Sequence, residues 1–316
     1  MKRVDYMVSL KKIATPIAVF SFGLLLAGCT DSTTNSATST VNQNSASIVT
    51  PTDTHTATAS QLANSTYTSN TSPVVLINGN KSTLDPNSWQ TNKVIYANLD
   101  SQNRTSNPNT AYLQPTNVAN DELRTTQTVK PTGWHQKFVN GEAILNRGHE
   151  IAYSLSKGIA MDGSYNPSQQ SGDQNNPKNL FTQTAWANQK LQTVYESQVR
   201  NALKAGKKVI YQVTPIFNGN DKMAKGVQLQ AISTDKTLNF NVFIYNVQPG
   251  VSFNYTDGIS KIDNNMKVPE LNGSPNFNDN GNKTSTHTTY HRHHYVRNAI
   301  IAHAVYHHFA KRHHRL

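Results

Sequence analysis

Large apolar side chains occupy only part of this 316-residue chain, and their distribution limits what it can fold into. From Thr30 to about Ser72 the sequence consists almost wholly of Ser, Thr, Asn, Ala and Gln. Such a segment buries too little apolar surface to offset the entropy lost on ordering, so we expect a disordered linker over residues 30–72. Apolar and aromatic residues return at Val74, and they predict one folded domain over residues 73–271.

The N-terminal residues 1–29 have the pattern of an export signal. A basic start precedes an apolar run over residues 13–27 that is short for a membrane span. The run ends in Leu26-Ala27-Gly28-Cys29, which resembles the lipobox at which bacterial lipoproteins are cleaved and acylated. We expect Cys29 to carry the lipid and the protein to lie on the extracellular face of the membrane, or to be secreted. An uncleaved signal anchor is the alternative. Because Cys29 is the only cysteine, the domain has no disulfide.

The folded region has a mixed pattern that predicts an α+β domain with an antiparallel sheet as its core. Leu191, Tyr195, Val199 and Leu203 follow at four-residue spacing, and Gly206 is a plausible stop, which predicts a helix over residues 184–205. Alternating Val, Ile, Tyr and Phe predict strands, with turn residues between the last three. The extended segments are expected at residues 74–78, 93–98, 143–146, 208–217, 227–233 and 238–247.

Polar residues share this predicted helix with the apolar ladder. Asn188, Glu196 and Arg200 are separated by eight and four residues, so we expect them along one side of the helix. His149 precedes them at the end of a predicted strand. A histidine, an amide, a carboxylate and an arginine are the groups that a one-metal phosphodiesterase needs.

Each of these residues also has an ordinary structural explanation. Glu196 and Arg200 at i and i+4 could form a surface ion pair of small energy. Asn188 could be a solvated helix residue, His149 a hydrogen-bonded core histidine, and Asn179 a turn residue after a proline. The functional interpretation therefore rests on the combination.

Three blocks of sequence resemble the DNA/RNA non-specific endonuclease family with the ββα-metal motif, in its DNA-entry nuclease branch. They read Asn-Arg-Gly-His-Glu-Ile-Ala-Tyr, Asn-Pro-Lys-Asn-Leu-Phe-Thr-Gln-Thr-Ala-Trp-Ala-Asn-Gln and Tyr-Glu-Ser-Gln-Val-Arg, at residues 146–153, 176–189 and 195–200. The resemblance runs from about residue 74 to 270 and implies a catalytic helix beside two strands. It also implies an enzyme that hydrolyses phosphodiester bonds of DNA and RNA and leaves 5′ phosphates.

The resemblance implies a role for each matching residue. His149 would be the general base that activates water, and Asn188 the single protein ligand of the metal, with Mg²⁺ expected and Mn²⁺ as an alternative. Glu196 would hold the metal's waters, and Arg200 would contact the scissile phosphate. Asn179 would support the site through hydrogen bonds.

One position departs from the family's motif, which usually begins with aspartate where this chain has Asn146. If that acid raises the basicity of the histidine, this enzyme is expected to be slower or to prefer a higher pH. Gly148 would permit a tight backbone approach, and Arg147 would either serve the site or pair structurally. Arg104 and Arg124 lie in polar loops where either could grip phosphates, and the sequence does not choose between them.

The net charge of +11 favours a polyanionic partner, and phosphate contacts provide most non-specific affinity for nucleic acids. We therefore expect DNA and RNA to bind through the phosphate backbone. Residues 272–316 form a low-complexity linker and a basic tail, and nine of the twelve histidines lie between residues 286 and 316. The tail is expected either to bind cell wall or another polyanion, or to be a solvated extension. A surface lipoprotein that binds DNA with weak or lost catalysis is the alternative function.

Overall fold

The structure of the protein, a computed structural model, describes residues 48–49, 54–55, 57–120 and 124–275. The predicted signal peptide with Cys29, much of the predicted linker and the histidine-rich tail lie outside these residues, so the predictions made for them stay predictions. Within the described ranges, no helix combines the length and the apolar character that a membrane span requires.

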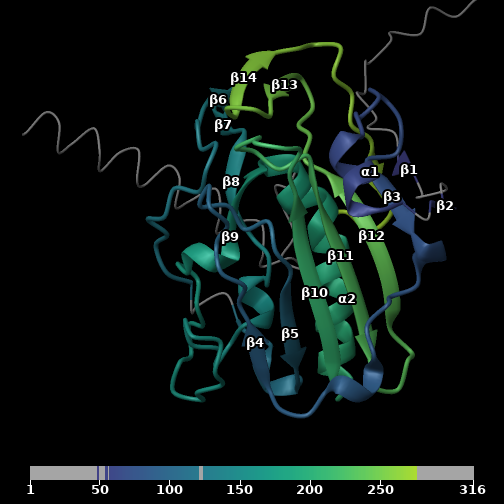
Figure 1. The fold of residues 1–316 in the computed structure, drawn as a ribbon, viewed down its shortest axis with the longest axis vertical. Helices are drawn as coiled ribbons and strands as arrows, with labels where there is room; N and C mark the ends of the chain where they lie inside the picture. Colours follow the sequence, from purple (N-terminus) through teal and green to yellow (C-terminus); the bar gives the residue numbers. More distant parts are fainter. Residues whose placement is uncertain (1–47, 50–53, 56, 121–123, 276–316) are drawn as a thin grey trace, which may run out of the picture. The chain divides into compact units, whose positions relative to one another are not determined.

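A seven-stranded sheet forms the centre of the described region, in the order β2-β3-β12-β11-β10-β5-β4 (Figure 1). All its pairs are antiparallel except β2 with β3, which confirms the predicted antiparallel core. The strands are β2 (Thr54–His55), β3 (Val74–Ile77), β4 (Lys93–Ile95), β5 (Asn109–Leu113), β10 (Val209–Ile216), β11 (Gly226–Ser233) and β12 (Asn239–Tyr245).

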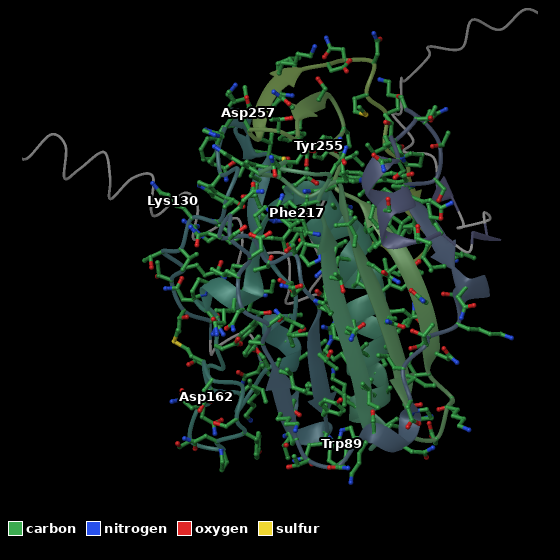
Figure 2. All side chains as sticks on the ribbon, in the orientation of Figure 1. Trp89, Lys130, Asp162, Phe217, Tyr255 and Asp257 are labelled. Carbon is green, nitrogen blue, oxygen red and sulfur yellow. The ribbon has the colours of Figure 1, made fainter. Side chains whose placement is uncertain are left out.

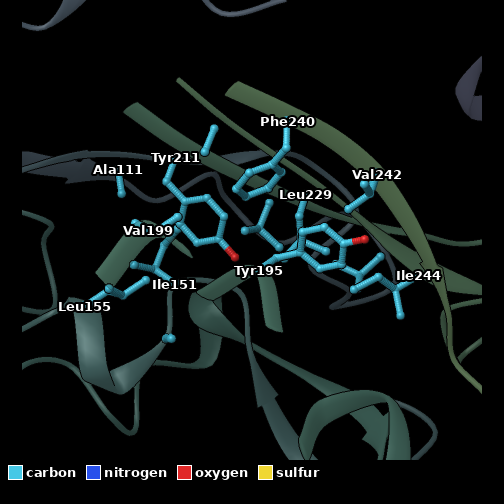
Figure 3. Packing of buried hydrophobic residues seen from close by; sticks show 14 of the residues in the cluster. Ala111, Ile151, Leu155, Tyr195, Val199, Tyr211, Leu229, Phe240, Val242 and Ile244 are labelled. Atoms are coloured by element: carbon cyan, nitrogen blue, oxygen red, sulfur yellow. The ribbon is translucent and has the colours of Figure 1, made fainter. Parts of the chain in front are cut away.

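One face of this sheet packs against α2 (Thr193–Lys204), which runs behind β10 and β11 in Figure 1. Alternation along the strands sends Tyr211 of β10 and Phe240 of β12 to this face, where they meet Tyr195 and Val199 of the helix (Figure 3). The rings of Tyr195 and Phe240 lie 5.3 Å apart, centroid to centroid. The apolar ladder predicted on the helix therefore holds it on the sheet.

The opposite face of the sheet is covered in part by α1 (Ala59–Asn64), a helix within the predicted linker. Leu62 is 3% exposed and packs with Ile216 and Phe243, which point away from α2. The Tyr67 hydroxyl donates to the Lys267 carbonyl at 2.9 Å and fixes the following segment. The linker prediction was therefore wrong for residues 57–72, because one leucine can anchor a short capped helix where an apolar surface already exists.

Smaller elements surround the sheet. The strand pairs are β8 (Leu145–His149) with β9 (Leu180–Thr184), β6 (Phe138–Val139) with β7 (Glu142–Ala143), β13 (Val251–Asn254) with β14 (Ile259–Ile262), and β1 (Ile48–Val49) with β15 (Glu270–Leu271). Single 3₁₀ turns occur at η1 (Asn78–Asn80), η2 (Pro86–Ser88), η3 (Pro115–Asn117), η5 (Tyr153–Leu155) and η6 (Pro177–Asn179). The antiparallel pair of β8 and β9, whose strands are joined by the long segment 150–179, is called the β8–β9 hairpin below. The helix that follows it directly gives the ββα arrangement expected from the sequence.

The predicted helix over residues 184–205 is present, but its first part is not α-helical. The segment η7 (Ala187–Gln192) is a π-helix that continues into α2. In an ideal α-helix, residues eight apart lie about 80° away from perfect alignment. A π-helix has more residues per turn, so it rotates Asn188 back toward the line of Glu196. Asn188 and Glu196 are therefore more nearly aligned along the helix than they would be in a continuous α-helix.

Candidate active site

The β8–β9 hairpin directs its motif residues to two different faces. Asn146 pairs across the hairpin with Gln183, and Gly148 lies two residues further along the same face. Arg147 and His149 lie at alternate positions and turn to the other face, against the segment 124–129. The motif over residues 146–149 therefore places side chains on both faces of the β8–β9 pair.

Asn188, in the π-helix, faces the side of the hairpin that carries Asn146. The Asn188 side-chain nitrogen, Nδ2, donates to Gln183 Oε1 at 2.9 Å, and Asn146 Nδ2 lies 3.3 Å from Asn188 Oδ1. The Thr193 hydroxyl donates to the Asn188 backbone carbonyl at 3.0 Å, five residues back along the widened turn. The Asn188 nitrogen thus donates to Gln183, and the Asn188 oxygen, which accepts from Asn146, has a second lone pair that could meet a cation.

Two glutamines connect Asn188 to the rest of the helix. Gln183 Nε2 donates to Gln192 Oε1 at 2.9 Å, and both side chains are fully buried. Gln192 Nε2 donates in turn to the His149 backbone carbonyl at 2.9 Å and to Glu196 Oε1 at 2.7 Å. A continuous chain of amides therefore joins Asn188, the end of β8 and Glu196.

His149 is held by the segment beyond the other face of β8. Its Nε2 lies 3.0 Å from the Gln174 backbone oxygen and 2.9 Å from Gln127 Nε2. A carbonyl can only accept, so the Gln174 contact places the ring proton on Nε2 and leaves the lone pair on Nδ1. The Gln127 contact suits the other tautomer, and Gln127 Nε2 also donates to the Gln174 carbonyl at 2.9 Å. The two contacts of Nε2 therefore favour different tautomers of the ring.

Burial lowers the pKa of His149 from 6.5 to about 4. The Gln174 carbonyl opposes this shift by stabilising the protonated ring, and the Arg124 guanidinium adds to it by repulsion. The adjoining Glu150 is fully buried, and burial raises its pKa well above the ordinary value. The imidazole is consequently neutral across the physiological range, as a base must be.

Glu196 and Arg200 do not rely on each other as hydrogen-bond partners in the way a simple surface pair would. The Glu196 carboxylate accepts from Gln192, whereas Arg200 donates to Ser154 at 2.8 Å and to Ser197 at 2.6 Å. Burial raises the pKa of Glu196, and the Gln192 hydrogen bond and then the charges of Arg200 and Arg124 oppose that rise. Both arginines therefore lie close enough to Glu196 for their charges to lower its pKa.

Arg124 and Arg104, which the sequence treats alike, lie in different surroundings. The Arg124 guanidinium stacks 4.7 Å from the Tyr153 ring centroid and lowers the pKa values of both His149 and Glu196. Arg104 is 9% exposed and bonds to Asp100 at 2.8 Å and to two backbone carbonyls. It also stacks on Phe217 at 4.8 Å, beyond the upper end of β10 (Figure 2). Arg104 is thus a structural residue, and Arg124 is a site candidate.

The remaining motif residues support the backbone. Asn179 is fully buried, and its side chain exchanges two hydrogen bonds with the backbone of Ile151, at 2.8 and 3.0 Å. This pairing fixes the chain just after His149. Arg147 stacks 4.8 Å from the Trp134 ring and donates to the Val129 carbonyl. These contacts hold the two strands and the segment 124–129 together.

Sequence reasoning missed the glutamines that connect these groups. Gln183 and Gln192 carry the amide chain, and Gln127 contacts His149 from a loop more than twenty residues upstream. The signal for Gln192 was present, because it lies four residues after Asn188 and four before Glu196. Gln183 sits in the middle of a fully buried strand, where a long polar residue is unusual and indicates a buried hydrogen-bond network.

Comparison with known proteins identifies the same architecture. The family model of the DNA/RNA non-specific endonucleases matches residues 82–235. The crystal structure of NucA from Streptococcus agalactiae with magnesium ion bound is 31% identical, with a TM-score of 0.53, and the match covers 60% of this chain and 88% of that one. The NucA structure with no metal bound is 29% identical, with a TM-score of 0.52 and coverage of 62% and 90%.

The matched region contains the β8–β9 hairpin, the π-helix and α2, the elements that carry His149, Asn188 and Glu196. Fold, order of motifs and sequence identity agree on a nuclease, a hydrolase that acts on nucleic acids. The chain belongs to the DNA/RNA non-specific endonuclease family.

Proposed function

We propose that the protein is an exported, Mg²⁺-dependent endonuclease that hydrolyses phosphodiester bonds of DNA and RNA without sequence preference and leaves 5′ phosphates. The observation that carries the proposal is the Gln192 side chain, which bonds at once to the backbone of His149 and to the carboxylate of Glu196. It links the backbone of the residue that carries the neutral imidazole to an acidic helix side chain, and Asn188 is joined to this unit through Gln183.

The oxygen donors at the helix fit Mg²⁺. Asn188 presents an amide oxygen, because its nitrogen is bonded to Gln183, and Glu196 offers a carboxylate eight residues further along the helix. Mg²⁺ prefers oxygen ligands and keeps most of its waters, so one amide ligand and a carboxylate that accepts from those waters suffice. The NucA structure with magnesium bound supports this choice of ion. When bound, the ion would stabilise negative charge on the leaving 3′ oxygen.

His149 is proposed as the general base. In the tautomer with the proton on Nε2, which donates to the Gln174 carbonyl, Nδ1 has the lone pair that takes a proton from the attacking water. The same carbonyl then stabilises the ring when it becomes positively charged. The depressed pKa keeps the base deprotonated before each turnover, at the cost of lower basicity.

Arg200 and Arg124 are proposed to contact the scissile phosphate. Each guanidinium affects the Glu196 carboxylate electrostatically, so both lie beside the reacting groups. A planar guanidinium donates two parallel hydrogen bonds to phosphate oxygens, and its charge favours the transition state, in which negative charge accumulates. Contacts of this kind read phosphate and not base, which agrees with non-specific cleavage.

The test is digestion of plasmid DNA and of RNA by the full chain, with Mg²⁺ or with EDTA, beside His149→Ala. We expect cleavage that needs both the metal and His149, with products that a 5′-phosphate-specific exonuclease degrades. His135→Ala is the matched control, because His135 is exposed and should leave cleavage unchanged. Cleavage in EDTA, or by His149→Ala at the wild-type rate, would remove the proposal. DNA retention without cleavage would favour the surface-binding alternative.

Export and lipid attachment are proposed from the sequence, with residues 1–29 as the signal and Cys29 as the acylated residue. Residues 73–271, extended upstream by α1, form the nuclease domain, and residues 272–316 form the linker and tail. In a bacterial host, Cys29→Ala should release the protein from the membrane fraction and abolish its labelling by a radioactive fatty acid. Equal labelling of the two forms would contradict a lipid anchor at this position.

A further inference from the structure

Gly148, in the motif of β8, has no room for a side chain. A Cβ atom at this position would lie 2.3 Å from Gln183 Oε1, 2.7 Å from Gln183 Cβ and 3.0 Å from Gln183 Cδ. Its φ angle is not in the left-handed region, so backbone conformation does not require glycine here. The requirement comes from Gln183, whose side chain lies across the Cα atom of Gly148, and not from the close backbone approach expected from the sequence.

Gln183 fills this space with a buried amide that uses both of its polar atoms. Its Oε1 accepts from Asn188 Nδ2 at 2.9 Å, and its Nε2 donates to Gln192 Oε1 at 2.9 Å. The residue is fully buried, so water cannot replace either partner. An asparagine amide can rotate by half a turn at little steric cost, which would exchange the positions of Nδ2 and Oδ1. Two hydrogen bonds oppose that exchange, because Asn188 Nδ2 donates to Gln183 Oε1 at 2.9 Å and Asn188 Oδ1 accepts from Asn146 Nδ2 at 3.3 Å. The bond to Gln183 is the shorter of the two, and its acceptor is fully buried.

We infer that Gln183 is a positioning residue, which turns the Asn188 carboxamide so that its oxygen and not its nitrogen meets a divalent cation, and that Gly148 is glycine to admit Gln183. This inference rests on the proposed role of Asn188 as the metal ligand. An amide nitrogen has no lone pair to offer a metal ion, so a rotated Asn188 cannot bind it. Residues that orient a ligand commonly contribute about 10–100-fold to metal affinity.

The inference makes two substitutions dependent on each other. Gly148→Ala in the wild type displaces the Gln183 amide, because the new methyl group occupies its place. In a Gln183→Gly background the amide and the Cβ atom of residue 183 are both gone, so the methyl group at residue 148 has space. Gly148→Ala should therefore lower metal affinity in the wild type and change it little in the Gln183→Gly background.

The test measures Mn²⁺ binding by the full chain without nucleic acid, from the paramagnetic resonance signal of free Mn²⁺, together with thermal unfolding. We expect Gln183→Gly and Gly148→Ala each to weaken binding about 10–100-fold. The double variant should bind Mn²⁺ about as weakly as Gln183→Gly alone. Gln183→Met keeps the volume of the side chain and loses its polar atoms, so it should show the same loss in a well-folded protein.

Gln230→Ala is the matched control, because Gln230 is a buried glutamine in β11 that bonds to Ser82 and Thr83 away from the site. It should lower the unfolding temperature and leave Mn²⁺ affinity unchanged. Wild-type affinity in Gln183→Met, or an equal loss from Gly148→Ala in both backgrounds, would overturn the inference. A wild-type protein that neither binds Mn²⁺ nor cleaves DNA would instead overturn the proposed function.

Discussion

At the scale of single residues, the His149 ring shows that burial sets its charge state more strongly than any charged neighbour does. Burial is the largest cause of its low pKa, about 4, and the Arg124 charge acts in the same direction. The strand position of His149 could be predicted from the motif, and its role as the base stays a proposal. Its contacts with Gln127 and Gln174 could not, because they come from loops that carry no periodic pattern.

The low pKa of His149 has a consequence for stability. Between pH 6.5 and about 4 the unfolded chain takes up a proton at this residue and the folded protein does not. Stability from this group is therefore complete above pH 6.5 and is lost as the pH falls through 4. Urea unfolding at pH 7 and pH 5 should show the wild type losing roughly 1–2 kcal/mol more than His149→Gln does. Equal losses in the two proteins would mean that the ring titrates normally.

Asn146 is the second residue whose role is predictable from geometry. Positions 146 and 149 differ by three along a strand, so their side chains point to opposite faces, and Asn146 meets Asn188 and not His149. We therefore expect Asn146→Asp to act on metal affinity. Its carboxylate would attract the cation next to Asn188 and strengthen Mn²⁺ binding about tenfold, or ~1.4 kcal/mol.

The measurement for Asn146→Asp is a Mn²⁺ titration beside a pH profile of DNA cleavage. Unchanged Mn²⁺ affinity with a shifted pH profile would contradict the geometric argument. It would instead support the expectation from the sequence, that an acid at this position raises the basicity of the histidine.

At the scale of elements, the site depends on the π-helix and on the segment that secures it. The helix itself was predictable from its apolar ladder. The π-helical part was not, because a widened turn has no signature in the types of residue that form it. Lys190 of the π-helix is buried, bonds to Glu270 at 3.0 Å, and donates to the Pro275 carbonyl. The C-terminal end of the domain is thus attached two residues from Asn188.

This attachment should be measurable as stability. Lys190→Ala leaves the Glu270 carboxylate, whose side chain is 16% exposed, without its main partner. We expect the free energy of unfolding to fall by about 2–3 kcal/mol. Lys204→Ala, on an exposed position in the last turn of α2, is the control and should change it by less than about 0.5 kcal/mol. A similar small effect from both variants in urea unfolding would show that the ion pair does not hold the π-helix.

At the scale of the whole domain, the sheet is covered on both faces, and only one cover was predicted from the sequence. The amphipathic pattern of α2 predicts that this helix covers one face. The α1 segment has only one large apolar residue within a polar tract, so its sequence does not predict a cover. Strand β12 did carry a sign of the second cover, since Phe243 adds an apolar side chain on the face opposite Phe240 and Val242. A strand that is apolar on both faces needs a cover on each.

The cover formed by α1 predicts that the domain needs residues upstream of residue 73. Leu62→Ala should lower the free energy of unfolding by about 2–3 kcal/mol, because Leu62 is 3% exposed against Ile216 and Phe243. Ser60→Ala, on the exposed side of the same helix, should have little effect. If both variants unfold at the wild-type urea concentration, the helix contributes nothing to the stability of the domain.

The account of this nuclease is tested most directly by the rate of plasmid cleavage in His149→Ala, Asn188→Ala and the double variant, in Mg²⁺. If a base and a metal ligand serve one step, each single variant should lose about a thousandfold or more in rate. The double variant should lose far less than the product of the two losses, because residues that act as a unit are not additive. Near wild-type cleavage by either single variant, or fully multiplicative losses, would contradict a single site built from these two residues.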